Sequence, residues 1–146
     1  MCVVLVPVER NGALGLLTIR RGTGSGHGKL ALVGGFLEAH ETWRAGSARE
    51  VYEETGLSVE AGDLRARNFA STEPDHRFII LFAECPVQTL PTPLPPLPVQ
   101  EETTERGLVF GPGDLRSVFA FELHVAEAEA FFAERSITGP HRFTRF

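Results

Sequence analysis

The sequence predicts a single strand-rich α+β domain with one helix in the middle of the chain and a second near its C-terminus. Size and composition favour one domain, since the chain has 146 residues, of which 42% are hydrophobic and 23% charged, as is usual for a soluble globular protein with its own core. Short aliphatic or β-branched runs are separated by turn residues, as strands are, while two longer segments carry apolar residues at helical spacing. We therefore expect residues 1–146 to form one domain.

The first part of the chain predicts three strands. Residues 3–8 and 14–19 are aliphatic runs separated by Asn11-Gly12, a strong hairpin signal, so we expect two antiparallel neighbours. Residues 22–28, GTGSGHG, predict a mobile connection. They lack the Lys-Ser/Thr of a P-loop and the arrangement of a dinucleotide fingerprint. Residues 29–33 then predict a third, short strand.

Residues 35–57, GFLEAHETWRAGSAREVYEETGL, predict a loop followed by a helix. Thr42 can cap the first helical turn, and Gly56 supplies a left-handed residue at the end, so we expect the helix from about Trp43 to Thr55. At 100° per residue the helix has an acidic face, and an opposite face that is expected to pack. That second face consists of Ala45, Ala48, Val51, Tyr52 and Thr55.

The acidic face of this helix carries Glu50, Glu53 and Glu54. Like charges at this spacing destabilise a helix by about 0.2–0.5 kcal/mol per pair, so something should compensate them. Arg49 lies four residues before Glu53 and can brace it, but one guanidinium cannot neutralise these three carboxylates and Glu41 as well. A hard divalent cation can, because Mg²⁺ prefers oxygen ligands such as carboxylates, water and substrate phosphates.

Residues 35–57 resemble the Nudix box, and the sequence is similar to those of Nudix hydrolases. Every defining position of the box matches, namely Gly35, Glu41, Arg49, Glu50, Val51, Glu53, Glu54, Gly56 and Leu57. The resemblance implies a Nudix-type α/β/α sandwich around a mixed β-sheet. It also implies hydrolysis of a nucleoside diphosphate linked to another moiety, by attack of water on a pyrophosphate phosphorus, with Mg²⁺ or Mn²⁺ as the cofactor.

The resemblance assigns roles to single residues. Glu53 and Glu54 would be the core metal ligands, and Gly35 would belong to the same metal site. Glu50 would be a ligand or the general base, and Arg49 would orient a glutamate through an ion pair. Two alternatives are a salt-bridged surface helix and a box that folds without catalysing.

The resemblance also implies a glutamate in the loop before the strand at residues 108–110, where it would complete the metal site or act as the base. Glu102 is the first choice because of its distance from that strand, followed by Glu101 and Glu105. A solvated acidic loop is the alternative. Which residue acts as the base stays open.

The second half of the chain predicts two more strands and a closing helix. Residues 64–72 predict a strand, and residues 78–85, FIILFAEC, predict a central strand because they form the most apolar run. The proline-dense residues 91–98 predict a stiff loop between strands rather than a partner-docking motif. Residues 122–135 predict an amphipathic helix. The tail at residues 137–146 could pack on the domain or on a second subunit, so a homodimer stays open.

The net charge and the N-terminal apolar run indicate which partners and which cellular location to expect. The net charge of −5 at pH 7 argues against broad nucleic-acid or acidic-membrane binding, which usually needs a basic surface, but not against a small nucleotide substrate held through a metal ion. The apolar run at residues 2–8 contains Pro7 and follows no basic residue, so it predicts neither a signal peptide nor a membrane span. We expect a cytoplasmic protein with Cys2 and Cys85 reduced.

Three functions other than hydrolysis of a small nucleotide are considered for the same fold: a nucleotide sensor, an isomerase and an enzyme acting on RNA ends. A non-hydrolysing sensor that binds ADP-ribose or a related nucleotide predicts tight binding without turnover. Isomerisation of a prenyl diphosphate would need a cysteine acid near the metal, for which Cys85 is the candidate, and the acidic charge disfavours RNA ends as substrates. Three leaving moieties stay open: the sugar part of an ADP-ribose or ADP-sugar type of substrate, a second nucleoside, and the pyrophosphate of a nucleoside triphosphate.

Overall fold

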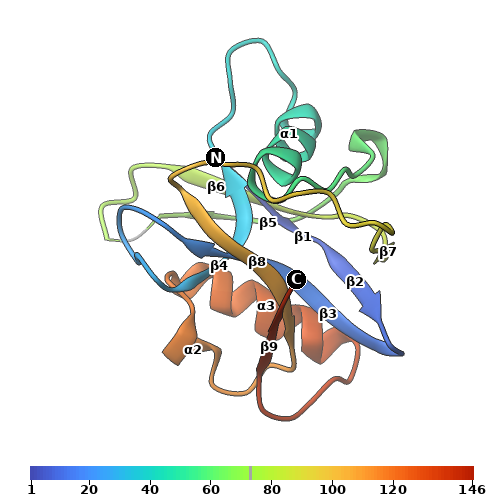
Figure 1. Cartoon of the computed structure of the whole chain (residues 1–146). Helices are drawn as coiled ribbons and strands as arrows, with labels where there is room; N and C mark the ends of the chain where they lie inside the picture. The colour runs from blue at the N-terminus through green and yellow to red at the C-terminus, as the bar shows by residue number, and fades with distance from the viewer. Residues whose placement is uncertain (73) are drawn as a thin grey trace.

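The computed structural model describes residues 1–72 and 74–146, and within them nine strands form one mixed sheet. The strands are β1 (Cys2–Leu5), β2 (Pro7–Arg10), β3 (Ala13–Arg21), β4 (Leu30–Gly35), β5 (Arg65–Ser71), β6 (Ile79–Glu84), β7 (Gln88–Thr89), β8 (Thr103–Phe110) and β9 (Arg142–Arg145). The helices are α1 (Trp43–Thr55), the short α2 (Leu115–Val118), α3 (Glu122–Glu134) and one 3₁₀ turn, η1 (Ala61–Asp63). Helix α1 lies over one face of the sheet and α3 over the other (Figure 1), and each packs on its own apolar cluster. The predicted layered arrangement around a mixed sheet is confirmed.

The N-terminal strands follow the prediction except that one of them is divided. The strand predicted over residues 3–8 breaks at Val6 into β1 and β2. β1 pairs with β4 and β6, whereas β2 pairs with β3 and β7. The predicted antiparallel hairpin between β2 and β3 is confirmed, and its turn residues Asn11 and Gly12 have φ values of 53° and 76°, as a type I′ turn requires.

Strand β4 changes its neighbour along its length. Residues 30–32 pair with β3, and residues 33–35 pair with β1. At this transition the backbone N–H groups of Leu32 and Gly34 donate to side chains from the helices instead of to a neighbouring strand. Because a buried backbone N–H needs an acceptor, the transition fixes where those helical side chains lie.

The predicted central strand is an internal strand of the sheet. β6 lies between β5 and β1 in the strand order. Ile80 and Phe82 are buried on one face and Ala83 on the other, while Ile79 is 64% exposed. The apolar run therefore covers only one face fully, as is common in sheets with antiparallel pairs.

Helix α1 begins and ends as the sequence predicts. The Thr42 hydroxyl accepts a hydrogen bond from the Ala45 N–H at 3.2 Å. Gly56 follows the helix in the left-handed region, with φ of 71°, and its N–H donates to the Tyr52 carbonyl oxygen at 2.7 Å. These caps satisfy backbone groups that have no partner inside the helix.

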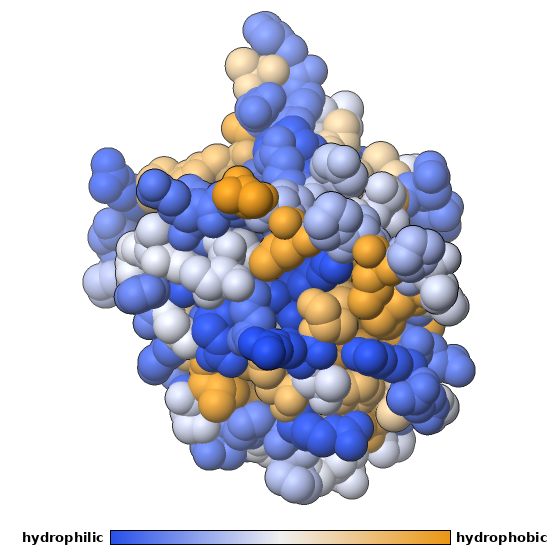
Figure 2. Space-filling model, in the orientation of Figure 1, coloured by the Kyte–Doolittle hydropathy of each residue, from blue (hydrophilic) through white to orange (hydrophobic). Residues whose placement is uncertain are grey.

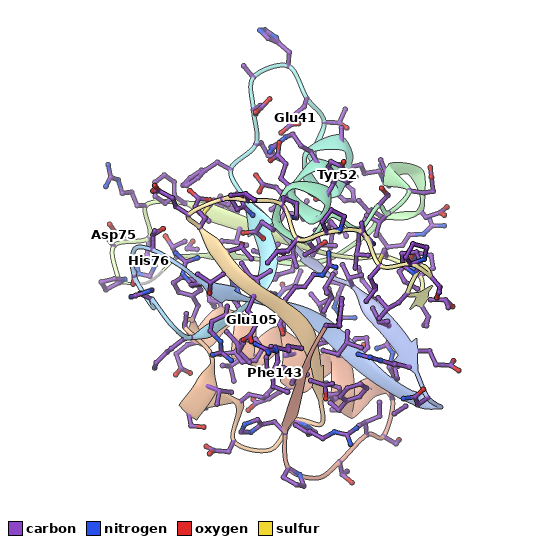
Figure 3. All side chains as sticks on the ribbon, in the orientation of Figure 1. Glu41, Tyr52, Asp75, His76, Glu105 and Phe143 are labelled. Carbon is purple, nitrogen blue, oxygen red and sulfur yellow. The ribbon has the colours of Figure 1, made fainter. Side chains whose placement is uncertain are left out.

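The prediction of which α1 face packs is partly wrong. Val51 and Thr55 are buried as expected, but Ala45 is exposed and Tyr52 is 58% exposed on the outer side of the helix (Figure 3). Glu54, assigned to the acidic outer face, is only 6% exposed. The helix is rotated so that part of its acidic face points at the sheet, because Glu54 provides the acceptor for a β4 N–H group.

A strap formed by residues 91–102 joins β7 to β8, as the prolines predict. Arg106 holds the strap against the domain. It is 4% exposed and donates hydrogen bonds to the carbonyl oxygens of Thr55 and Pro95. The ring of Phe146 covers the guanidinium at 5.3 Å. β8 is longer than predicted, and the C-terminal tail pairs with it as β9, so the tail packs on its own domain. No helix among the described residues is long and apolar enough to cross a membrane.

Arg106→Ala should lower the free energy of unfolding by about 2–4 kcal/mol, because one buried and one partly buried carbonyl oxygen lose their donors and the strap loses its packing. Denaturant unfolding measures this loss. Arg116→Ala is the matched control, since its ion pair with Glu122 is exposed and should contribute at most about 1 kcal/mol. Equal losses in the two variants would contradict the role given to Arg106.

Candidate active site

A cleft of about 500 Å³ lies beside the place where β4 passes from β3 to β1. Its walls are formed by the N-terminal residues, strands β3 and β4, the loop that follows β4, helix α1, the end of the strap and the start of α3. Residues lining the cleft include Arg21, Gly35, Arg49, Glu50, Glu54, Glu102, Phe121 and His124. The structure therefore brings together five of the residues that the sequence predicts for the catalytic and metal site: Gly35, Arg49, Glu50, Glu54 and Glu102.

Glu54 is the most buried carboxylate of the cleft. Its Oε2 accepts a hydrogen bond from the Gly34 N–H at 2.9 Å. Burial raises the pKa of Glu54 to about 8, with repulsion from Glu50 and Glu102 acting in the same direction and the Gly34 N–H opposing it. A carboxylate in this position gains from a nearby positive charge, because the charged form lacks sufficient compensation.

Glu50 lies one turn before Glu54, against the backbone of β4. A side chain at Gly35 would start 2.5 Å from Glu50 Oε1, so the glycine leaves room for the carboxylate to approach the main chain. Burial raises the pKa of Glu50, while Arg49 lowers it and Glu53 and Glu102 raise it. Gly35 thus belongs to the site through the space that it leaves.

Arg49 connects the loop of the box to the helix. Its guanidinium donates to Glu41 Oε1 at 2.7 Å, to Glu53 Oε2 at 2.7 Å and to Glu50 Oε1 at 3.1 Å. It also donates to the Phe36 carbonyl oxygen at 3.0 Å. The predicted ion pair with Glu53 is present, but Arg49 orients three glutamates rather than one. Its hydrogen bonds hold the pKa of Glu41 below its usual range.

The loop between β4 and α1 projects beyond the helix, and its protruding end is hydrophilic (Figure 2). Glu41 lies at the end of the loop, beside the start of α1 (Figure 3). Its Oε1 accepts from the Glu38 N–H at 2.7 Å as well as from Arg49. Glu41 is therefore a residue that shapes the loop, and it does not line the cleft among the described residues.

Glu102 reaches the cleft from the end of the strap. The Gly22 N–H donates to the Glu102 carbonyl oxygen at 2.8 Å, and any side chain at Gly22 would collide with the Glu101 carbonyl oxygen. Of the two other predicted glutamates, Glu101 does not line the cleft. Glu105 pairs with Arg20 at 2.6 Å near Phe143, away from α1 (Figure 3). Placement therefore favours Glu102.

Glu53 differs from its neighbours on α1. Its side chain is 49% exposed and pairs with Arg49, and it does not line the cleft in the part of the chain that the structure describes. Its backbone carbonyl oxygen accepts a hydrogen bond from Gln100 Nε2 at 2.9 Å, which ties the strap to the helix. Glu53 thus lies at the rim of the site.

The donors of the cleft fit a hard divalent cation. Glu50, Glu54 and Glu102 supply carboxylate oxygens, which Mg²⁺ and Mn²⁺ prefer. Burial, and to a smaller extent repulsion from neighbouring glutamates, raises the pKa values of Glu50 and Glu54. Among the described residues no three His, Cys, Asp or Glu side chains are already arranged as a metal cluster. One reason is that Glu50 and Glu53 form ion pairs with Arg49 in this structure.

Sequence reasoning missed the far wall of the cleft. Phe121 and His124 are not among the site residues that the sequence predicts. Both line the cleft from the start of α3, and the Arg21 guanidinium lies 4.9 Å from the centre of the Phe121 ring. Their position at the start of the helix predicted near the C-terminus is the only sequence signal that they offer.

A second cavity, of about 560 Å³, lies under the strap. Its apolar lining includes Val6, Leu57 and the prolines of residues 91–96. None of the described residues that line it is charged. It offers no chemistry for phosphate or metal, so the acidic cleft is the candidate active site.

Residues 1–133 match the NUDIX domain family, and the chain belongs to this family. The predicted membership of the Nudix hydrolases is thereby confirmed. A comparison with curated protein sequences gave no significant match.

Solved structures share the fold at low sequence identity. The NUDIX domain of Shewanella oneidensis NrtR complexed with ADP ribose has a TM-score of 0.67 at 14% identity, covering 92% of this chain and 86% of that chain. A C. elegans Ap4A hydrolase binary complex has a TM-score of 0.68 at 10% identity, covering 92% and 97%. A bifunctional NMN adenylyltransferase/ADP ribose pyrophosphatase from Francisella tularensis, complexed with AMP and a Mn ion, has a TM-score of 0.61 at 21% identity, and this chain spans 41% of its length.

Without metal, the stability of the protein should fall as pH rises from about 5 to 8. The folded-state pKa of Glu54, about 8, exceeds the unfolded value of about 4.3, so the folded state binds more protons in between and the slope reaches at most about 1.4 kcal/mol per pH unit. Glu54→Gln should remove this slope. Denaturant unfolding in EDTA at several pH values tests this, and parallel curves for the two proteins would contradict it.

Proposed function

We propose that this protein hydrolyses the pyrophosphate linkage of a nucleoside diphosphate joined to another moiety, with the help of Mg²⁺ or Mn²⁺. The observation that carries the proposal is the convergence of Glu50, Glu54 and Glu102 on one cleft. Two of these carboxyl groups have pKa values raised by burial and mutual repulsion. Such perturbed groups in a cleft are typical of functional sites.

We propose that Glu50 and Glu54 hold the cation from within the cleft and that Glu53, which lies at the rim, joins them as a further ligand, with the Gly35 backbone beside them. When bound, the cation neutralises charge on the phosphate oxygens and lowers the pKa of the attacking water. Arg49 keeps Glu50 and Glu53 oriented through its ion pairs.

The general base is Glu50 or Glu102 in this proposal. Glu102 stands on the strap and can accept a proton from water in the cleft without leaving its backbone contact with Gly22. Arg21 adds a positive charge to the same cleft, and its Nε donates to the Ser25 carbonyl oxygen at 2.8 Å. A fixed guanidinium near a phosphate stabilises charge that develops in the transition state.

The substrate class is an ADP-ribose or ADP-sugar type of compound or a nucleoside triphosphate. The structural likeness to proteins complexed with ADP ribose and with AMP and Mn supports a nucleotide. The net charge of −5 supports a small substrate over a nucleic acid. A single domain over residues 1–146, a cytoplasmic location and a homodimer stay predictions from the sequence.

The second candidate function is a non-hydrolysing nucleotide sensor. It is favoured by the likeness to the NrtR domain complexed with ADP ribose. The sensor predicts a nucleotide that binds tightly and is not cleaved.

Among ADP-ribose, ADP-glucose, NADH, diadenosine polyphosphates and canonical or oxidised nucleoside triphosphates, at least one should be cleaved with Mg²⁺ and none with EDTA. Glu53→Gln and Glu54→Gln should each lower kcat by at least about 100-fold, because the cation loses a ligand that stabilises transition-state charge. Glu60→Gln is the control, since Glu60 is exposed and lies outside both the cleft and the ion pairs that Arg49 makes with the glutamates of the site. A nucleotide that raises Tm without being cleaved would establish the sensor instead.

The adjacent pair Glu101 and Glu102 offers a matched comparison. Glu102→Gln should lower kcat by about 100-fold or more with the best substrate, as expected for loss of a general base or a metal ligand, and Glu101→Gln should leave it unchanged. Steady-state kinetics at saturating Mg²⁺ distinguish the two. Equal activity of both variants would show that the acidic end of the strap is only a solvated loop.

A further inference from the structure

His124 is buried, yet it lines two cavities. It is 6% exposed and belongs to the walls of both the acidic cleft and an adjoining cavity of about 380 Å³. Met1 and Phe121 are shared by the same two cavities, so His124 stands at their junction. The smaller cavity is mostly apolar, with Ile80 and Leu123 in its walls.

One ring nitrogen of His124 is already engaged. The Leu32 N–H donates to His124 Nδ1 at 3.2 Å, so Nδ1 acts as an acceptor and carries no proton. Burial, with a contribution from Arg21, lowers the pKa of His124 to about 3, so the ring is neutral at physiological pH. In a neutral imidazole with an unprotonated Nδ1, the proton is on Nε2.

The Nε2–H group has no acceptor within the protein as far as the described residues go. The rings of Phe82 and Phe121 pack against the imidazole at centroid distances of 6.0 and 5.0 Å, and neither supplies a polar acceptor. Fully enclosed side-chain atoms without a partner occur in Arg10, Ser47, Arg67, Thr103 and Arg106, and His124 Nε2 is not one of them. The donor is therefore not fully enclosed, and His124 lines both cavities.

We propose that His124 positions the nucleoside part of the substrate, with Nε2–H donating a hydrogen bond to an uncharged acceptor on the sugar or the base. This inference rests on the proposed function in that it takes the acidic cleft as the place of the pyrophosphate. A neutral donor between aromatic rings suits an uncharged oxygen or nitrogen, whereas phosphate oxygens are better served by cations and guanidinium groups.

The spacing along β4 agrees with this assignment. His124 is bound to the Leu32 N–H, and Glu54 to the Gly34 N–H. Residues two apart on a strand are separated by about 7 Å. A phosphate held at the Glu54 end and the sugar attached to it can bridge that distance. Backbone hydrogen bonds to the same strand therefore set the distance between the two parts of the site.

Two variants separate the functional role from the structural one. In His124→Asn the amide oxygen can replace Nδ1 as the acceptor for Leu32, but no donor remains at the position of Nε2. In His124→Gln the amide nitrogen can take the place of Nε2, but the acceptor for Leu32 is lost. Asparagine should therefore preserve the fold and weaken nucleoside binding, whereas glutamine should lower Tm and preserve binding.

The test is calorimetric titration of wild type and both variants with AMP, GMP, CMP, UMP and inorganic pyrophosphate in Mg²⁺. His124→Asn should raise Kd for the best nucleoside monophosphate about tenfold, the loss expected for one hydrogen bond, and leave Kd for pyrophosphate unchanged. His124→Gln should bind both as wild type does, despite its lower Tm.

Three results would overturn the proposal. The first is unchanged nucleotide affinity in His124→Asn, and the second is an equal loss of nucleotide and pyrophosphate affinity in that variant. The third is wild-type protein that binds no nucleoside monophosphate more tightly than pyrophosphate. Absence of turnover would contradict the proposed hydrolysis but would not affect this test, because binding is measured without cleavage.

Discussion

The site depends on one constraint, which is that β4 passes from β3 to β1 and leaves two backbone N–H groups for side chains to satisfy. Glu54 comes from the helix over one face of the sheet, and His124 comes from the helix over the other. Each buried N–H would cost about 1–3 kcal/mol without an acceptor. The same hydrogen bonds that stabilise the transition therefore fix a carboxylate and an imidazole beside the cleft.

Burying carboxylates near one another is unfavourable, and the structure offsets the cost only in part. Arg49 compensates Glu41, Glu50 and Glu53, so the loop, the helix and the rim of the site are linked through one guanidinium. Glu54 receives one backbone N–H and keeps a raised pKa. The negative charge that stays uncompensated lies in the cleft, where a divalent cation would neutralise it. This connects the electrostatics of the fold to the proposed chemistry.

Contacts along the strap place its last carboxylate, Glu102, at the cleft. Arg106 fastens the strap to the C-terminal end of α1, Gln100 bonds to the Glu53 carbonyl oxygen, and Gly22 bonds to the Glu102 carbonyl oxygen. Phe146 covers Arg106 from the end of the chain. Residues with no part in the chemistry thus determine the position of Glu102.

The sequence by itself determined the features that depend on close neighbours: the α1 caps, the hairpin turn, the Arg49–Glu53 pair and the family to which the box belongs. Caps, turns and pairs four residues apart are local, so a short window specifies them. Only the tertiary structure decided the rotation of α1, which buries Glu54 and exposes Tyr52, and the place of His124 beside the cleft. These depend on contacts between segments distant in sequence, which form only when the strands pair and the helices cover them.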